Sequence, residues 1–455
     1  DQQIDFPIIY TNAKLGVSKL SLDDNTDNLE PLFNTLVKSI PGPEVDDEIL
    51  TQFLITNLDY DNYVGRIAIG RLFNGSLESN KSYSLCNEDG TFSNMKIAVL
   101  YSFRGLQKIA VDKIEAGDIA AITGVEEIKI GDTISILENP VTLPRIKVDE
   151  PTISMIFYVN NSPFAGTEGK FLTSRHIKER LEREMLGNVA IKIKETDRAD
   201  AFEVAGRGEL QMAVLIETMR REGYEFMVSK PQVITKKENN VLMEPVEKLF
   251  VDVVEEHVGV ITEIVAERKG KMVNLQNLGN GRVDLEFLIT SRGLIGFRSK
   301  FQIETKGSGV MNTLFEQYEP WHGPIPQRQS GALVSDRQGK TTTYASLSMV
   351  DRGELFVDVG TTVYAGMIVG ERNRSGDLDI NIVREKKLTN VRSSTSEATV
   401  VLRPPRPLSL DQAIEFIAED ELVEITPESQ RLRKMELDAV KRAISRKKTK
   451  TEAQN

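Results

Sequence analysis

Residues 202–210 read Phe-Glu-Val-Ala-Gly-Arg-Gly-Glu-Leu, an apolar strand that ends in a tight Gly-Arg-Gly turn and enters a helix. The neighbouring segments have the periodicity of a strand at 152–159, a helix around 177–185, a strand at 189–194, a helix up to Met219 and a strand at 226–228. The order strand, helix, strand, strand, helix, strand predicts a ferredoxin-like α/β domain over residues 150–230.

The same order returns further along the chain. Apolar residues alternate with polar ones in 249–253 and again in 283–287, and Ile261, Ile264 and Val265 lie at helical spacing between these strands. We therefore expect a second ferredoxin-like domain over residues 243–324, repeated in plan rather than in sequence.

Short strands dominate the segments on either side of this pair. Residues 46–145 contain hairpin turns such as Asn74-Gly75 and Asp89-Gly90, which favour a small closed β-barrel. Residues 325–455 form a strand-rich C-terminal domain that we expect to end in two helices. One begins at Ser409, which forms a capping box with Gln412, and the other begins at Thr426-Pro427. The fold class is thus multi-domain α+β.

Residues 1–43 contain one strand, one loop and one helix. Phe6–Tyr10 is an apolar run typical of a buried parallel strand, and apolar residues at helical spacing follow over 29–36. Pro41-Gly42-Pro43 ends the helix. Because so few elements cannot close a core alone, we interpret this segment as part of a larger α/β domain.

Composition excludes several function classes. The chain has 455 residues, a net charge of −11 and one Cys, so an intramolecular disulfide is impossible and indiscriminate coating of nucleic acid is disfavoured. No apolar run approaches the ~18 residues of a membrane helix. The three His are scattered, which predicts no metal site, and Gly339-Lys340-Thr341 lacks the earlier Gly of a phosphate-binding loop. We expect no catalytic residue in this chain.

Two basic segments remain as candidate RNA-binding elements. The first, within 374–392, comprises Arg374, Arg384, Lys386, Lys387, Asn390 and Arg392. The second is the expected last helix, with Arg431, Arg433, Lys434, Lys441 and Arg442. Either segment alone would more often be a solvated charged surface, but two in one terminal domain of an acidic chain favour contact with phosphates. Asn390 is a candidate for reading base or ribose edges.

Several motifs resemble those of translational GTPases. Gly65–Leu72 and Ala116–Gly124 are similar to the β-barrel domain of these proteins, Gly206–Leu210 to the signature of their third domain, and Ser291–Arg298 to that of their fifth. Lys386–Arg392 together with Asp420–Glu424 resembles one family, TypA/BipA. The resemblance covers essentially the whole chain.

This resemblance implies a GTPase domain that uses GTP and Mg²⁺, of which residues 1–43 would be the last strand, loop and helix. Asn12-Ala13-Lys14 stands where the family's last guanine-contacting loop is usually Ser-Ala, and no Asn-Lys-x-Asp motif is present. We therefore expect this chain to be the C-terminal part of such a GTPase, with no cofactor of its own. It should neither bind nor hydrolyse GTP.

The family resemblance also implies partners: the 70S ribosome through 23S rRNA, A-site tRNA and ribosomal proteins, with a monomeric protein off the ribosome. It implies a cytoplasmic role in translation, ribosome assembly and adaptation to stress or cold. Two alternatives stay open. One is a fragment of a LepA-like elongation factor, against which 386–390 argues; the other is a stand-alone, non-enzymatic RNA-binding protein that begins naturally at Asp1.

Overall fold

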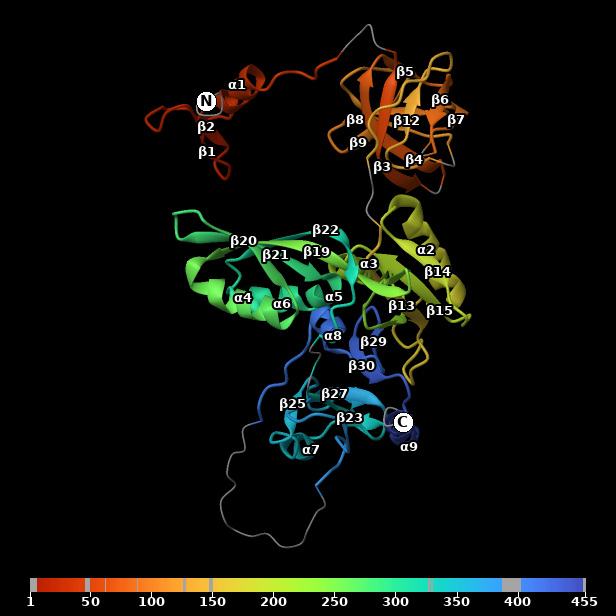
Figure 1. Cartoon of the computed structure of the whole chain (residues 1–455), viewed down its shortest axis with the longest axis vertical. Coiled ribbons are helices and arrows are strands. Elements are labelled where there is room, and N and C mark those ends of the chain that lie inside the picture. The colour runs from red at the N-terminus through yellow and green to blue at the C-terminus, as the bar shows by residue number, and fades with distance from the viewer. Residues whose placement is uncertain are drawn as a thin grey trace. The chain divides into compact units, whose positions relative to one another are not determined.

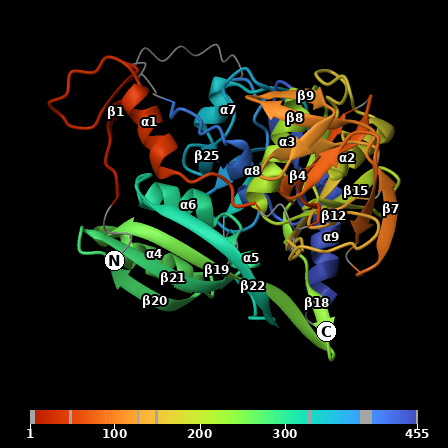
Figure 2. The same ribbon diagram turned by 90° about the horizontal axis from the view of Figure 1, so that it is seen from above.

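The computed structural model describes residues 6–45, 50–61, 63–87, 89–125, 128–146, 150–325, 328, 330–386 and 402–452, with side chains up to Ser445. The chain divides into two compact units, Asp1–Lys147 and Val148–Asn455. Figures 1 and 2 show the elements of each unit from two directions.

The N-terminal segment is a small hairpin followed by one helix. Its elements are β1 (Tyr10–Asn12), β2 (Val17–Lys19) and α1 (Glu30–Ser39). The prediction of a buried parallel strand over Phe6–Tyr10 is wrong: β1 pairs antiparallel with β2, and Phe6 and Ile8 are exposed. An antiparallel partner needs only a short turn, whereas a parallel one needs a crossover that the described residues of this segment do not provide.

The rest of the first unit is an antiparallel sheet of eight strands in the order β7-β6-β12-β3-β4-β11-β8-β9, and β5 pairs with β10 in a separate ladder. The strands are β3 (Gln52–Asp61), β4 (Gly65–Asn74), β5 (Ser76–Glu78), β6 (Ser82–Cys86), β7 (Phe92–Lys96), β8 (Leu100–Arg104), β9 (Gln107–Val111), β10 (Lys113–Glu115), β11 (Ile119–Ile122) and β12 (Thr133–Ser135). Figure 1 shows the sheet curled on itself. The side chains of Phe53, Leu72 and Ile134 are buried.

The second unit begins with the elements expected over 150–230. They are β13 (Ile153–Val159), α2 (Ser174–Gly187), β14 (Lys192–Glu195), β15 (Ala201–Gly206), α3 (Glu209–Arg221) and β16 (Phe226–Ser229). The sheet order β14-β15-β13-β16, antiparallel throughout, is that of a ferredoxin-like plan. The helices are amphipathic, and Leu181 and Ile216 pack from them onto the sheet.

A second set of elements repeats this plan. It comprises β17 (Gln232–Val233) and β18 (Lys236–Glu238) as a connection, then β19 (Val241–Val254), η1 (Glu255–His257), α4 (Val258–Glu267), β20 (Lys271–Asn277), β21 (Arg282–Thr290), α5 (Ser291–Leu294), α6 (Phe297–Glu304) and β22 (Val310–Pro320). The strands pair in the order β22-β19-β21-β20. Its apolar core, which includes Leu249, Ile261 and Phe287, draws all its members from 249–311.

The C-terminal segment extends the first ferredoxin-like sheet. Its elements are β23 (Gly331–Ser335), β24 (Gly339–Lys340), α7 (Thr343–Leu347), β25 (Gly353–Leu355), β26 (Thr362–Val363), β27 (Met367–Arg372), β28 (Leu378–Ile380), α8 (Leu410–Phe416), β29 (Glu421–Ile425), β30 (Gln430–Lys434) and α9 (Ala439–Glu452). β29 pairs antiparallel with β16, and the sheet continues through β30, β27, β23 and β28. One core contains residues from both segments, such as Phe226 and Ile414.

One expected helix start in this segment is present and the other is wrong. Ser409 and Gln412 form the predicted capping box of α8. Thr426-Pro427 instead lies in the turn of the β29–β30 hairpin, where Thr426 Oγ1 accepts from Ser429 N at 2.9 Å and donates to Ser429 O at 2.8 Å. These bonds close a turn rather than begin a helix, so the last helix starts only at Ala439.

A buried carboxylate holds the extended sheet together. Glu424 on β29 has no solvent exposure and accepts hydrogen bonds from Asn160 Nδ2, Ser162 Oγ and Tyr364 Oη at 3.0, 2.7 and 2.7 Å. Arg431 Nη1 supplies the balancing charge at 3.1 Å. Burial, followed by the adjacent Glu424 charge, raises the pKa of Tyr364 well above its ordinary value. A buried charge is tolerated only when it is paired and hydrogen-bonded, as this one is.

Tyr364→Phe should destabilise the second unit by about 1.5–3 kcal/mol, because it removes a hydrogen bond to a buried charge. The measurement is the free energy of unfolding of the 148–455 unit in urea. Tyr344→Phe is the matched control: Tyr344 lies on the surface of the same unit, 40% exposed, and its change should stay within about 0.5 kcal/mol. Equal effects of the two substitutions would contradict the role assigned to Glu424.

Candidate nucleic-acid interface

Exposed cations of the first basic segment lie around the short strand β28. Arg374 is exposed in the turn that precedes the strand, whereas Arg384 and Lys386 are exposed after its end. Arg374 is therefore separated from the other two by the length of the strand. Lys387, Asn390 and Arg392 lie outside the described residues.

Arg384 is held at its backbone by the start of the neighbouring helix α7. Thr342 Oγ1 donates to the carbonyl of Arg384 at 2.5 Å, and the guanidinium lies 5.7 Å from the centre of the Tyr344 ring. Both side chains are exposed. A guanidinium beside an exposed aromatic ring can pair with a phosphate while the ring offers a stacking surface to a base.

The last helix contributes one exposed cation and one structural cation among its described side chains. Lys441 is exposed. Arg442 is buried and pairs with Asp379 on β28, while its Nη1 donates to the carbonyls of Glu436 and Leu437 at 2.9 and 2.6 Å. Arg442 thereby fastens the start of α9 to the strand that leads to Arg384. The structure thus brings the two basic segments together.

Three cations assigned to RNA contact from sequence lie instead in β30, where Arg433 and Lys434 are buried and Arg431 is half-buried. Arg431 pairs with Glu168 and Glu424, and Arg433 Nη1 donates to Asn161 Oδ1 at 2.8 Å. Lys434 lies within 3.0 Å of Asp377, Asp420 and Glu421.

The charges of these residues are used for interactions inside the fold. Burial acts to lower the pKa of Lys434, but Glu421 and Asp377 outweigh it and the pKa is raised. Arg433 and Lys434 expose 2% and 1% of their surface, so neither presents a charge to a phosphate. Arg431, Arg433 and Lys434 are therefore corrected from surface cations of a helix to residues with polar partners inside the fold. Successive side chains of a strand point to opposite faces, and Arg433 and Lys434 are both buried because both faces of β30 are covered at this end.

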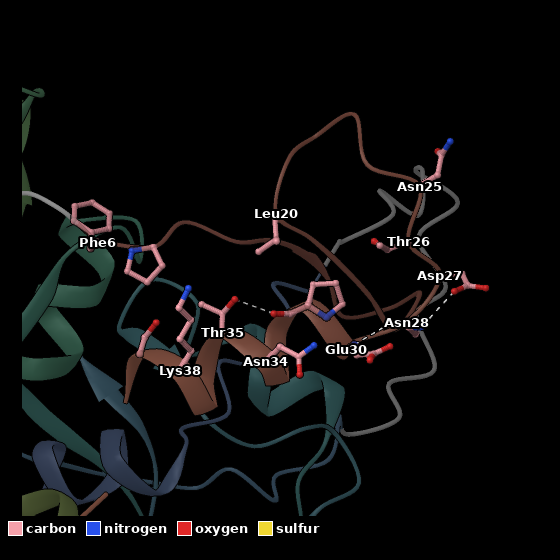
Figure 3. A pocket seen from close by; sticks show the side chains of 13 residues that line it. Phe6, Leu20, Asn25, Thr26, Asp27, Asn28, Glu30, Asn34, Thr35 and Lys38 are labelled. Atoms are coloured by element: carbon pink, nitrogen blue, oxygen red, sulfur yellow. Dashed lines mark hydrogen bonds between the residues drawn. The ribbon is translucent and has the colours of Figure 1, made fainter. Parts of the chain in front are cut away.

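The N-terminal triplet Asn12-Ala13-Lys14 closes the β1–β2 turn. Asn12 Oδ1 accepts from Leu15 N at 3.2 Å, and the three residues are exposed. The pocket in this segment, of about 830 Å³, lies elsewhere, between α1 and the residues that precede it (Figure 3). It is lined by one cation, Lys38, and two acids, Asp27 and Glu30, so its charge does not favour a phosphate.

The two signature motifs of the ferredoxin-like segments touch each other. Glu209, the first residue of α3, accepts a hydrogen bond from the backbone N–H of Gly296 at 3.0 Å. Periodicity could not show this contact, because the two residues lie 87 positions apart and belong to separate elements. The only signal was that both positions fall within motifs.

Other chemistry is not found in the part of the chain that the structure describes. Among these residues no group of three or more His, Cys, Asp or Glu is arranged to hold a metal ion. No described helix is both long and apolar enough to cross a bilayer.

Parts of the chain match known protein domains. Residues 65–135 match domain 2 of elongation factor Tu, residues 241–329 match the C-terminus of elongation factor G, and residues 330–439 match the TypA/BipA C-terminal domain.

Curated relatives match almost the whole chain. The protein named large ribosomal subunit assembly factor BipA from Bacillus subtilis is 44% identical over 99% of this chain and 74% of its own length. The proteins of the same name from Salmonella typhimurium and Synechocystis are both 46% identical over 96% of this chain, and over 72% and 73% of their own lengths. The chain therefore belongs to the TypA/BipA family of translational GTPases.

Proposed function

We propose that this protein acts in assembly of the large ribosomal subunit and in translation, and that it binds ribosomal RNA through exposed cations of its C-terminal segment. The observation that carries the proposal is identity of 44–46% with relatives named large ribosomal subunit assembly factor. We further propose a cytoplasmic location, as a role on ribosomes would require.

The RNA-binding surface that we propose consists of Arg384, Lys386 and Lys441. It is supported by their exposure and by the bond from Arg442 to β28, which holds the two basic segments beside each other. Lys387, Asn390 and Arg392 continue the same segment in sequence and are included in the proposal. The surface would contact 23S rRNA and the acceptor end of A-site tRNA. Such contacts would depend strongly on salt, because each phosphate neutralised releases counterions.

The two ferredoxin-like domains (150–230 and 243–324) and the barrel (46–145) would act as a spacer that sets the reach of this surface. Off the ribosome we expect a monomer. We further propose that growth under stress or cold is where the activity is needed, as the family resemblance implies.

GTP and Mg²⁺ enter this proposal through a GTPase domain to which residues 1–43 would belong. Support comes from α1, which has no buried residue and exposes Phe33, Leu36 and Val37 along one side. An amphipathic helix of this kind ordinarily packs its apolar side against a core. In such a protein, hydrolysis of GTP would set the time at which the protein leaves the ribosome.

Arg384→Glu, Lys386→Glu and Lys441→Glu in one variant should weaken binding to large ribosomal subunits by at least about tenfold at moderate salt. The slope of log K against log salt should become shallower by about 0.7–0.9 for each phosphate that the variant no longer neutralises. Co-sedimentation across a salt series measures both quantities.

The control variant carries Lys237→Glu, Lys271→Glu and Lys306→Glu. It makes the same change in net charge at exposed sites outside the C-terminal segment. Equal losses of affinity in the two variants would mean that the effect comes from overall charge. Unchanged binding by the first variant would refute the proposed RNA-binding surface.

Residues 1–455 by themselves should show no saturable binding of a fluorescent GTP analogue with Mg²⁺. Asn12, Ala13 and Lys14 form a surface turn, and the pocket beside α1 has two acids and one cation among its lining residues, so its charge does not favour a phosphate. Asn12→Ser, which restores the usual family residue, should not create binding. Saturable binding in either protein would contradict the expectation.

A further inference from the structure

Five residues from three segments meet where the first ferredoxin-like domain faces the second. They are Glu209 at the start of α3, Arg268 just after α4, Gly296 between α5 and α6, and Asp411 and Glu415 on α8, and together they are called the Glu209 junction. The junction involves close steric contact as well as electrostatic interaction. A Cβ at Gly296 would lie 2.4 Å from the carboxyl carbon of Glu415, so a larger residue there would displace the Glu415 side chain. Gly296 also has a φ of 69°, which favours Gly.

The junction holds more acids than it can balance. Arg268 faces Glu209 and Glu415, but its hydrogen bonds go to carbonyls: 3.0 Å to Gly293 and 2.7 Å to Ile295. Asp411 and Glu415 lie four residues apart on one side of α8, and both repel Glu209. Burial raises the pKa of Glu415 as well, although Arg268 and Lys300 of α6 attract it. The junction therefore carries an excess of negative charge, and it is partly buried.

Apolar packing does not fix this contact. The core of the second ferredoxin-like domain takes its members from 249–311, and the core that joins the first domain to the C-terminal segment takes none of these residues. The two cores are separate, so the domains meet through contacts such as the Glu209 junction and the packing of α5 against β17, which pairs with β13.

We propose that the Glu209 junction is a proton-sensitive latch, closed when Glu209 is neutral and released when Glu209 is ionised, so that the second ferredoxin-like domain moves against the rest of the unit. A neutral carboxyl still accepts the Gly296 N–H through its carbonyl oxygen, without the repulsion from Asp411 and Glu415. The inference does not depend on the proposed function.

The direction of the pH dependence follows from the linkage between proton binding by Glu209 and closure of the junction. Burial, with repulsion from Glu415 and Asp411, raises the pKa of Glu209 to about 7, against an ordinary value of 4.5 once the junction opens. The closed form therefore binds the proton more tightly, and its population is greatest in acid and falls as the pH rises towards 7. From these two values, the closed-to-open ratio should be about tenfold higher at pH 6 than at pH 8.

The test is single-molecule energy transfer between dyes on Glu182→Cys in α2 and Gln276→Cys in β20. Both positions are exposed, and Cys86→Ala removes the one native thiol. The full chain should show two states whose ratio changes about tenfold between pH 6 and pH 8. A ratio independent of pH would overturn the proposal.

Variants separate the latch from a merely structural contact. Glu209→Gln is neutral at every pH and keeps an acceptor for Gly296, so it should stay closed without pH dependence. Glu415→Gln removes one repelling charge, which lowers the pKa of Glu209 and should move the transition to lower pH. Glu217→Gln, an acid on the same helix paired with Arg220 and Arg221, should behave as wild type.

Gly296→Ala is an independent check on the geometry. It places a methyl group against Glu415 and strains the backbone, so the open state should be more populated than in wild type at both pH values. A closed Gly296→Ala variant, or pH dependence that survives in Glu209→Gln, would overturn the proposal.

Discussion

The pairing of β16 with β29 is the constraint on which the rest of the second unit depends. It adds the C-terminal hairpin to the edge of the first ferredoxin-like sheet, so that an edge strand becomes an internal one and two segments share a core. A sheet extended in this way buries the polar side of β29, and Glu424 is the result. Its partners come from before β29 (Asn160, Ser162, Tyr364) and from β30 (Arg431), so a single carboxylate ties distant parts of the chain together.

Local periodicity was sufficient to predict both ferredoxin-like segments, because each strand and helix carries its own alternation. Val251 and Val253 point to one face of β19, and Ile261 and Ile264 lie on one side of α4; these patterns need no knowledge of distant residues. The capping box at Ser409 is equally local. The basic segment around Arg384 could be identified by composition, but its anchoring by Thr342 could not.

The failures in the second unit involve β29 and β30, whose place in the fold is set by pairing with strands far away in sequence. Thr426-Pro427 has the composition of a helix start, but pairing with β16 gives this stretch a hairpin instead, and tertiary context overrides the local preference. For the same reason, the sequence alone could not show which Arg and Lys residues of this segment lie on the surface and which lie in the interior. Lys441 and Lys434 are the same residue type seven positions apart; one is exposed, whereas the other is buried among three carboxylates that only the fold assembles.

The two joins within the second unit differ in kind, and the difference has a physical consequence. The C-terminal segment is held by a shared apolar core, and separating it would expose that core to water at about 25 cal/mol per Å² of apolar area. The second ferredoxin-like domain keeps its own core, and its signature motif meets Glu209 through a backbone hydrogen bond among unbalanced charges. Water can replace a polar contact at little net cost, so motion should concentrate at this second join. Under the proposed function the protein would fit a large RNA surface, and a joint around Glu209 and Gly296 would allow such a fit without weakening either domain.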